Sequence, residues 1–317
     1  METIYFLVQQ TMLFSIPLLL VALGGMFSER SGVVNIALEG IMIIGAFTGI
    51  FFISRFGNLF SPTITLFIAI IISALSGLIF SLLHAYASIN MSADQVISGT
   101  ALNIFAPAFA IYVTRAIQVV QQISFVNNFR IESVPILGNI PIIGNLLFKN
   151  SYITTYLGFI ILALSWFALY KTRFGLRLRS CGEHPQAADS VGINVYKMRY
   201  FGVAISGALA GIGGLVFVIP TSTNFNATVA GYGFLALAVL IFGQWKPMRI
   251  LYAAFFFGLM KTLASAYSGI TILSNLPISN SVYKMIPYIT TIIVLAFTSK
   301  NSQAPKASGL PYDKSVR

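Results

Sequence analysis

Long apolar runs, most of them close to the length that crosses a bilayer, follow one another along nearly the whole chain. A helix needs about 20 mostly apolar residues to cross a hydrocarbon core of about 30 Å. Such runs predict spans near 4–26, 33–53, 63–86, 96–113, 153–170, 200–220, 231–244, 249–269 and 283–299. The pattern therefore predicts an all-α, polytopic membrane helix bundle with about nine transmembrane helices, or between about eight and ten.

Two regions depart from this regular pattern. The run at 231–244 is short and contains glycine, and the second span carries Asn35 and Glu39 in its first half. In transporters, interrupted segments of this kind point to the translocation pathway. We expect re-entrant or interrupted segments within a single transmembrane domain over residues 1–299, followed by a tail over 300–317.

Composition supports a membrane protein and removes several other classes. Hydrophobic residues make up 57% of the chain and charged residues 9%, with a mean hydropathy of +0.85, which leaves no room for a soluble domain. The net charge of +11 lies in short loops between apolar runs, so it indicates orientation in a membrane and not nucleic-acid binding. The lone Cys181 excludes an internal disulfide and a cysteine-rich metal site.

The distribution of basic residues predicts the topology. The loop Lys171–Tyr200 holds six of the nineteen basic residues, and Lys246, Arg249 and the 300–317 tail add others. By the positive-inside rule these segments are cytoplasmic, which places a turn at Ser28–Arg30 inside, the amino terminus outside and the C-terminus in the cytoplasm. The segment 115–150 is then an outside, partly membrane-associated loop; if it spans or re-enters, the amino terminus changes sides.

A short capped helix is predicted inside the basic loop. In GEHPQAADSVGI, Pro185 fits the first position of a helix and Gly192 its left-handed stop, enclosing roughly two turns. A capped helix in a basic loop suggests a docking element.

Four stretches together resemble a known family. They are SERSGVVNIALEGIMIIGAF, SADQVISGTALNIFA, FGLRLRSCGEHPQAADSVGI and SGALAGIGG. The chain resembles the permease subunit of bacterial nucleoside ABC importers, within the wider family of ribose and branched-chain amino-acid ABC permeases. The resemblance implies a multi-pass protein of a bacterial cell membrane, surrounded by lipid. It also implies a second related permease forming a heterodimer, a cytoplasmic ABC ATPase with two cassettes, and an extracellular lipid-anchored nucleoside-binding protein.

The same resemblance implies an ATPase-coupling site around a helix over Glu183–Gly192. Its candidate residues are Arg177, Arg179, Glu183, His184, Ala187, Ala188 and Gly192. Small alanines suit a helix that sits in a groove, Glu183 at the helix start favours the positive end of the helix dipole, and the arginines could pair with acids of the partner. The alternative is an ordinary loop that is basic only for orientation.

Polar residues inside apolar runs are candidates for the transport pathway. Glu39 either lines the pathway, pairs with Arg30, or is a helix-capping or interfacial carboxylate. The other candidates are Asn35, Ser98, Asn103, Asn224 and Asn226. Such side chains also join helices to one another, and that alternative stays open.

Other positions predict structure. Asp94 or Gln95 is expected to cap the fourth span, with Ser92 as an alternative cap. The Gly45–Gly49 and Gly207–Gly211 spacings predict close helix packing. Lys261 must face the bundle interior or an interface, with Tyr267 a candidate neighbour.

Motifs that the sequence lacks limit the possible functions. The sequence has no Gly-Lys pair and hence no P-loop, so ATP and Mg²⁺ are expected to be used by a partner ATPase, with no cofactor or metal bound by this chain. No catalytic residues are expected, and the chain is predicted to be a transport subunit and not an enzyme. Three rivals remain: a permease for a pentose or branched-chain amino acids, an ion-coupled secondary transporter, and a membrane-embedded transferase or hydrolase.

Overall fold

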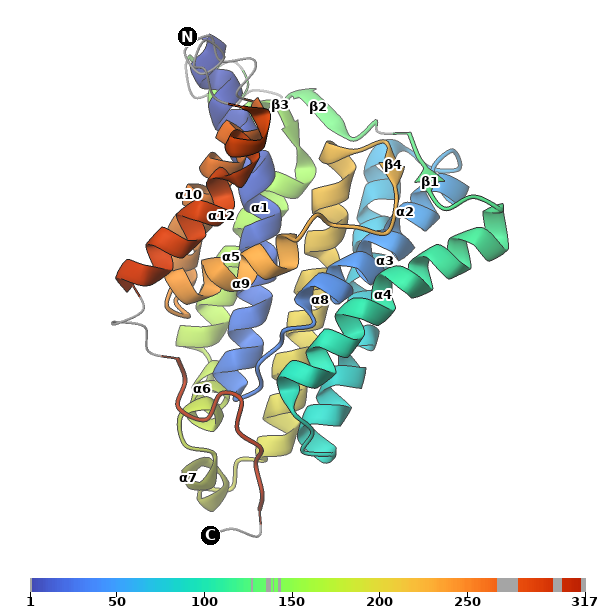
Figure 1. Cartoon of the computed structure of the whole chain (residues 1–317). Helices are drawn as coiled ribbons and strands as arrows, with labels where there is room; N and C mark the ends of the chain where they lie inside the picture. The colour runs from blue at the N-terminus through green and yellow to red at the C-terminus, as the bar shows by residue number, and fades with distance from the viewer. Residues whose placement is uncertain are drawn as a thin grey trace.

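Membrane-length helices form most of the computed structural model, with the two chain ends at opposite ends of the bundle (Figure 1). The structure describes residues 2–126, 128–134, 138, 140–141, 144–266, 279–298 and 304–314. Within these residues, seven helices are long and apolar enough to span a membrane. They are α1 (Glu2–Ser31), α2 (Leu38–Phe56), α3 (Pro62–Ala85), α4 (Gln95–Gln118), α5 (Ile153–Lys171), α8 (Val195–Thr221) and α10 (Pro247–Ala266). The predicted multi-pass helical bundle is confirmed.

Shorter elements complete the described chain. They are α6 (Arg173–Glu183), α7 (Pro185–Ser190), α9 (Tyr232–Phe242), α12 (Asn280–Thr298) and the π-helical turns Tyr86–Asn90 and Gly144–Phe148. Two antiparallel strand pairs lie at the end of the bundle that holds the amino terminus (Figure 1). They are β1 (Ile123–Ser124) with β4 (Asn224–Phe225), and β2 (Arg130–Ser133) with β3 (Lys149–Tyr152).

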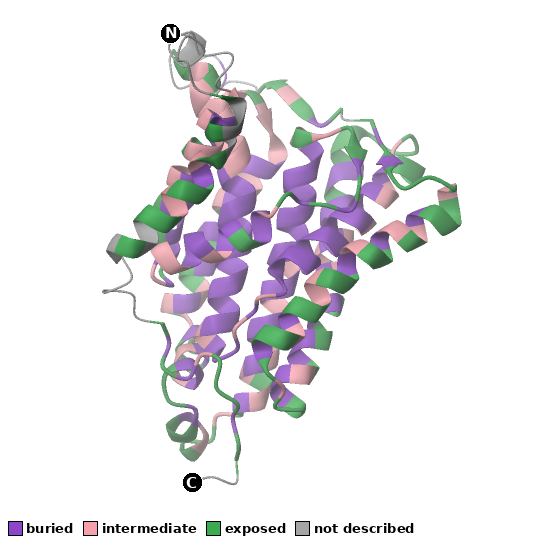
Figure 2. Ribbon diagram, in the orientation of Figure 1, coloured by how far each residue is buried: buried purple, intermediate pink, exposed green. Residues whose placement is uncertain are grey.

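The core is centred on α1 and α8, which are buried along most of their length (Figure 2). Helix α8 packs against α1, α2 and α3. Where α2, α3 and α8 cross, a Cβ added to Gly45 would overlap the backbone of Gly211, and one added to Gly77 would lie 2.8 Å from the Gly211 Cα. Ser73 Oγ donates to the Gly45 carbonyl at 2.8 Å across the same crossing. The close packing predicted from the glycine spacing is confirmed.

Helix α3 presents an apolar stripe outward. Its exposed residues Ile64, Phe67, Ile71, Leu75 and Ile79 recur every three or four positions, which places them on one side of the helix. An apolar outer face of this kind is suited to lipid or to another membrane subunit.

Three predicted features differ from the structure. Helix α1 continues through Ser31, so Ser28–Arg30 is helical and not a turn. The second span begins at Leu38 and not at 33, because Gly32 takes a left-handed φ of 100° and the chain then runs without regular structure to residue 35. The run at 231–244 yields only the 11-residue α9, which at about 1.5 Å per residue is too short to cross a membrane.

Candidate functional site

Residues 32–37 form an irregular linker between α1 and α2. Backbone groups away from water need hydrogen-bond partners, and here side chains from other helices supply them. The Val34 N–H donates to Gln95 Oε1 at 2.6 Å, and the Val34 carbonyl accepts from His84 Nε2 at 2.9 Å. Since a carbonyl only accepts, Nε2 carries the proton, which leaves His84 Nδ1 to accept from Ser98 Oγ at 3.1 Å.

Two asparagines complete the contacts of this linker. Asn103 Nδ2 donates to the Ile36 carbonyl at 2.9 Å, and its Oδ1 accepts from the Gly40 N–H at 2.7 Å. Asn35 Nδ2 donates to Ser206 Oγ at 2.9 Å, and its Oδ1 accepts from the Ala37 N–H at 3.1 Å. The structure therefore gathers three pathway candidates, Asn35, Ser98 and Asn103, around one unwound segment. Their hydrogen bonds fit the alternative of joining helices, and their role as pathway contacts stays a prediction.

Glu39 lies beside these residues and caps a second interrupted helix. Its two carboxylate oxygens accept from the Gly231 N–H at 2.9 Å and the Gly233 N–H at 2.6 Å, at the start of α9. The carboxylate thus meets orphan N–H groups at the positive end of the α9 dipole. A Cβ on Gly233 would overlap the Glu39 backbone, so the first turns of α2 and α9 are in direct contact. The predicted alternative of an Arg30 pair is wrong, because Arg30 contacts Glu183 instead; Glu39 is a capping carboxylate, although the helix it caps is not its own.

Glu39→Leu is expected to lower stability, because the buried Gly233 N–H and the half-buried Gly231 N–H would lose their acceptor, at up to about 1–3 kcal/mol each. Glu39→Gln keeps one acceptor oxygen and should cost less. Thermal unfolding of the purified protein in detergent measures both, with exposed Glu132→Leu on β2 as the control. Equal midpoints for wild type and Glu39→Leu would show that the carboxylate does not hold α9.

The two remaining pathway candidates lie apart from the linker. Asn224 is exposed in β4, and Asn226 lines an open hollow of about 720 Å³ with Arg115, Gln121 and Gln122 among its other residues. Figure 1 places β4 at the end of the bundle opposite α7. A single side-chain cluster therefore does not hold all six candidates.

Helices α6 and α7 form the predicted coupling region, at the end of the bundle opposite the amino terminus (Figure 1). Pro185 begins α7, and Gly192 follows it with a φ of 84°, so both predicted helix signals are confirmed. His184 caps α7, because its Nδ1 accepts from the Ala187 N–H at 3.2 Å. Pro185 and Ala188 are buried, whereas Ala187 is exposed, together with Gln186, Ser190 and Val191. Helix α7 is thus buried on one side, and its other side is exposed.

The sequence did not predict α6, and this changes three of the candidate residues. Glu183 is the last residue of α6 and not the start of α7, so its predicted interaction with the α7 dipole is wrong. Arg177 is exposed on α6. Arg179 instead lies over the Tyr170 ring at 5.0 Å, and its Nε donates to the Gly175 carbonyl at 3.4 Å. Of the two arginines, Arg177 is therefore the more exposed.

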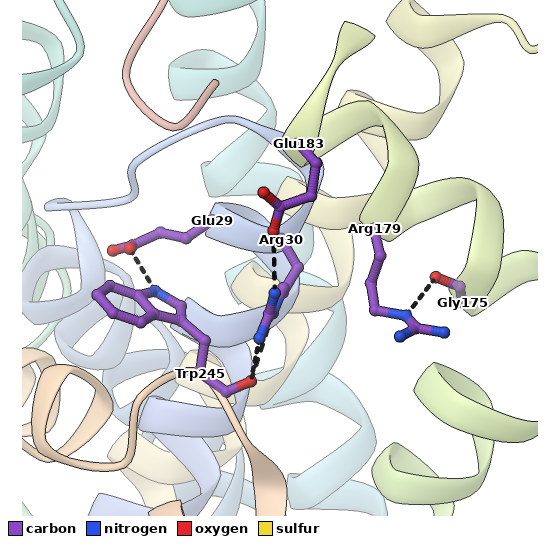
Figure 3. A network of polar contacts seen from close by, with 6 residues as sticks. All are labelled: Glu29, Arg30, Gly175, Arg179, Glu183 and Trp245. Atoms are coloured by element: carbon purple, nitrogen blue, oxygen red, sulfur yellow. Dashed lines mark hydrogen bonds and ion pairs between the residues drawn. The ribbon is translucent and has the colours of Figure 1, made fainter. Parts of the chain in front are cut away.

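A polar network joins α6 to the end of α9 (Figure 3). Arg30 Nη1 lies 3.4 Å from Glu183 Oε1, and its Nη2 donates to the Trp245 carbonyl at 3.2 Å. The Trp245 indole N–H donates to Glu29 Oε2 at 2.6 Å. Glu29 and Trp245 are buried. No residue spacing in the sequence predicts this network, although the charged residues Glu29 and Arg30 stand out at the end of an apolar run.

The described part of the C-terminal tail, residues 304–314, packs against the coupling region. The Ala307 N–H donates to the Gly182 carbonyl at 2.8 Å, and the Gly309 N–H donates to the Gly32 carbonyl at 3.2 Å. Arg199 Nη1 donates to the Leu310 carbonyl at 3.0 Å. The tail thereby joins α6, the 32–37 linker and α8.

Cys181 lies under this tail, in an apolar cluster with Ala188, Val195 and Tyr312. It is fully buried, and burial raises the pKa of its thiol to about 11. Because the thiolate is the nucleophile, a raised pKa makes the thiol less reactive near neutral pH.

Removing residues 304–317 is expected to speed maleimide labelling of Cys181 by at least about tenfold at pH 7.5, because the thiol loses its cover and its pKa falls. The chain has one cysteine, so the wild type needs no other change. Ser190→Cys, exposed on α7, is the control and should label rapidly with or without the tail. Equal Cys181 rates in both forms would contradict the docked tail.

Lys261 of α10 lies over the Tyr232 ring at 5.7 Å. Its candidate neighbour Tyr267 lies outside the described residues. The predicted cap of α4 is confirmed as Asp94, whose Oδ1 accepts from the N–H groups of Val96 and Ile97. Gln95 instead holds the linker.

Comparison with known proteins identifies the family. The family described as "Branched-chain amino acid transport system / permease component" matches residues 7–295. The nucleoside ABC transporter permease protein NupC of Lactococcus lactis is 42% identical over 99% of this chain and 98% of its own length. The guanosine ABC transporter permease protein NupQ of Bacillus subtilis is 44% identical over 98% of this chain and 97% of its own length.

A more distant relative and a negative result complete the comparison. The nucleoside ABC transporter permease protein NupB of Lactococcus lactis is 27% identical over 78% of this chain and 69% of its own length. No solved structure matches the chain. With a family match over most of its length and two relatives above 40% identity, the chain belongs to the family of branched-chain amino acid transport system permease components, and it is a transport component and not an enzyme.

Proposed function

We propose that this chain is the membrane permease subunit of an ATP-driven ABC importer for nucleosides. The observation that carries the proposal is its relatedness, across almost the full length, to two permeases named for nucleoside and guanosine transport. A putative glucose permease of Haloferax volcanii is less similar, at 29% identity, so a sugar cargo is less well supported than a nucleoside.

The partners follow from the same proposal. NupC and the more distant NupB are both nucleoside permeases of Lactococcus lactis. Two related permeases in one organism favour a heterodimer. A cytoplasmic ATPase with two cassettes would use ATP and Mg²⁺, and this chain would bind neither. A lipid-anchored extracellular protein would deliver the nucleoside.

In this proposal the ATPase contacts the exposed face of α7 and the neighbouring part of α6. The proposed contact residues are Arg177, Ala187 and Gln186, with Val191 at the end of α7 exposed beside them. The tail and the Lys246 loop lie close to these helices through contacts with Gly182 and Arg30, which suits their placement together on the cytoplasmic side. The C-terminus would then be cytoplasmic and the amino terminus outside.

The transport step is proposed to be alternating access. Closure of the ATPase cassettes would move α6 and α7, and the interrupted helices α2 and α9 would change position at the centre of the bundle. Interrupted helices at mid-membrane are where transporters commonly place their substrate sites. The Glu39 and Asn103 region is therefore the proposed pathway.

Uptake by cells that lack their own nucleoside transport tests the cargo. Cells expressing the complete transporter should accumulate labelled guanosine, and an excess of another nucleoside should compete. Ribose and leucine at the same excess should leave uptake unchanged. Uptake of labelled ribose or leucine, with no guanosine uptake, would support a pentose or amino-acid permease and overturn the nucleoside assignment.

A further inference from the structure

Helix α9 is a buried half-helix whose ends are both held by other elements. It has 11 residues, and Leu235, Ala236, Ala238, Val239 and Leu240 are among those buried. A helix that ends inside a membrane protein needs partners for its terminal N–H and C=O groups. Those partners also fix where the helix can move.

The charges at the two ends match the helix dipole. At the amino end, Glu39 of α2 accepts from Gly231 and Gly233. Just beyond the carboxyl end, the Trp245 carbonyl accepts from Arg30 of α1. An anion at the positive end and a cation near the negative end both stabilise a helix. Helix α9 is thus clamped between α2 and α1.

The chain turns sharply at the carboxyl end of α9 to make this second contact. Gln244 and Trp245 both have left-handed backbone conformations, with φ of 51° and 53°. Such conformations are uncommon outside glycine and persist when surrounding contacts hold them. The turn directs the indole of Trp245 to Glu29, so two consecutive residues of α1 hold one residue of the α9–α10 connection (Figure 3).

Arg30 also contacts the coupling region. Its Nη1 lies 3.4 Å from Glu183 at the end of α6, and a Cβ on Gly182 would overlap the Arg30 carbonyl. The end of α6 and the last turn of α1 therefore lie in backbone contact. If α6 moves while Arg30 and Trp245 stay in place, these contacts break.

We propose that α9 carries the movement of α6 and α7 to the centre of the bundle, with Trp245 as the positioning residue that joins the Glu29–Arg30 pair to α9. The contacts run from Glu183 through Arg30 and Trp245 along α9 to Glu39 at the start of α2. This proposal rests on the proposed function, because it describes how an ATPase acting at α7 reaches the pathway. A packed helix transmits such a shift because protein interiors deform little.

Trp245→Phe is the principal test, since it keeps a buried aromatic ring and removes the N–H donor to Glu29, at the cost of some packing volume. In the complete transporter reconstituted in proteoliposomes, we expect ATP hydrolysis to continue while nucleoside uptake per ATP falls by about tenfold. Glu29→Gln keeps an acceptor for the indole and should retain more coupling than Glu29→Leu. Trp166→Phe, which removes the chain's other tryptophan on α5, is the matched control and should not change the ratio.

The ratio of uptake to hydrolysis separates positioning from simple stability. A variant that only destabilises the protein would lower uptake and hydrolysis together and leave their ratio unchanged, which would overturn the proposal. If wild type and Trp166→Phe show no ATP-driven nucleoside uptake, the proposed function itself fails and this proposal fails with it. Normal wild-type uptake with an unchanged ratio in Trp245→Phe overturns only the role of α9.

A second test measures a distance with spin labels and leaves Glu29, Arg30, Glu183 and Trp245 unchanged. Spin labels at Lys246→Cys, next to Trp245, and at Met91→Cys, at the α3–α4 turn, both occupy exposed positions; Cys181→Ser removes the native thiol. Trapping the ATPase with vanadate should change the distance between the labels if α9 follows α6. An unchanged distance, in a complex that is shown to be trapped, would overturn the proposal.

Discussion

Ala187→Arg is expected to abolish ATP-driven nucleoside uptake while leaving the protein folded in the membrane. Ala187 is exposed on α7, whose other side is anchored through buried Pro185 and Ala188. A long charged side chain at the centre of this face would prevent a partner from packing against it. The fold should be unaffected, because Ala187 is exposed and the buried residues of α7 stay unchanged. Because the proposed route of energy input passes through α7, the loss should be nearly complete.

Uptake into proteoliposomes together with co-purification of the ATPase measures this effect. Met91→Arg places the same charge at an exposed position in the α3–α4 turn and should retain uptake. Normal uptake by Ala187→Arg would remove α7 from the energy-coupling interface. Loss of uptake in both variants would instead indicate a broader contact surface.

Gly211→Leu is expected to have the largest effect on stability of any single change considered. A side chain at Gly211 would overlap the backbone of Ser73 on α3. Gly45 of α2 also packs directly against Gly211. Ordinary overpacking costs roughly 1–3 kcal/mol, but here main-chain atoms and not flexible side chains stand in the way. The helices would have to separate, which weakens the crossing of α2, α3 and α8.

Thermal unfolding in detergent should place the Gly211→Leu midpoint at least roughly 5 °C below wild type, or the protein should fail to accumulate. Ala108→Leu, on the exposed side of α4, adds the same side chain where space is open and should leave the midpoint unchanged. A wild-type midpoint for Gly211→Leu would contradict the tight crossing.

The sequence predicts the fold well where local patterns decide the structure. Apolar length identifies the spans, the Gly207–Gly211 spacing identifies a close crossing, and the Pro185 and Gly192 signals define α7. Each of these features depends on residues within a few positions of one another.

The interrupted helices were harder to predict because long-range contacts create them. Nothing next to Val34 in the sequence shows that His84 and Gln95 satisfy its backbone groups. The Glu39 partners lie 192 and 194 residues away along the chain. A buried His or Gln in an apolar run could have suggested a bonded site, but not its partner.

The coupling region illustrates both cases. Local caps predict the small helix α7, yet the sequence pattern assigns Glu183 to the wrong helix because the residues before it are polar and basic. In the structure, α6 buries Leu178 and Cys181 against the bundle and exposes its arginine-rich side, so tertiary packing supports a helix that composition alone does not indicate.

In the proposed function, energy enters this transporter through a partner ATPase and reaches the bundle at α7. The most direct test is nucleoside uptake by the reconstituted complex with an ATPase variant that binds ATP but cannot hydrolyse it. We predict that uptake stops with this variant and is restored by the active ATPase, in the absence of any ion gradient. Continued uptake with the inactive ATPase, driven by a sodium or proton gradient, would contradict the account and identify a secondary transporter.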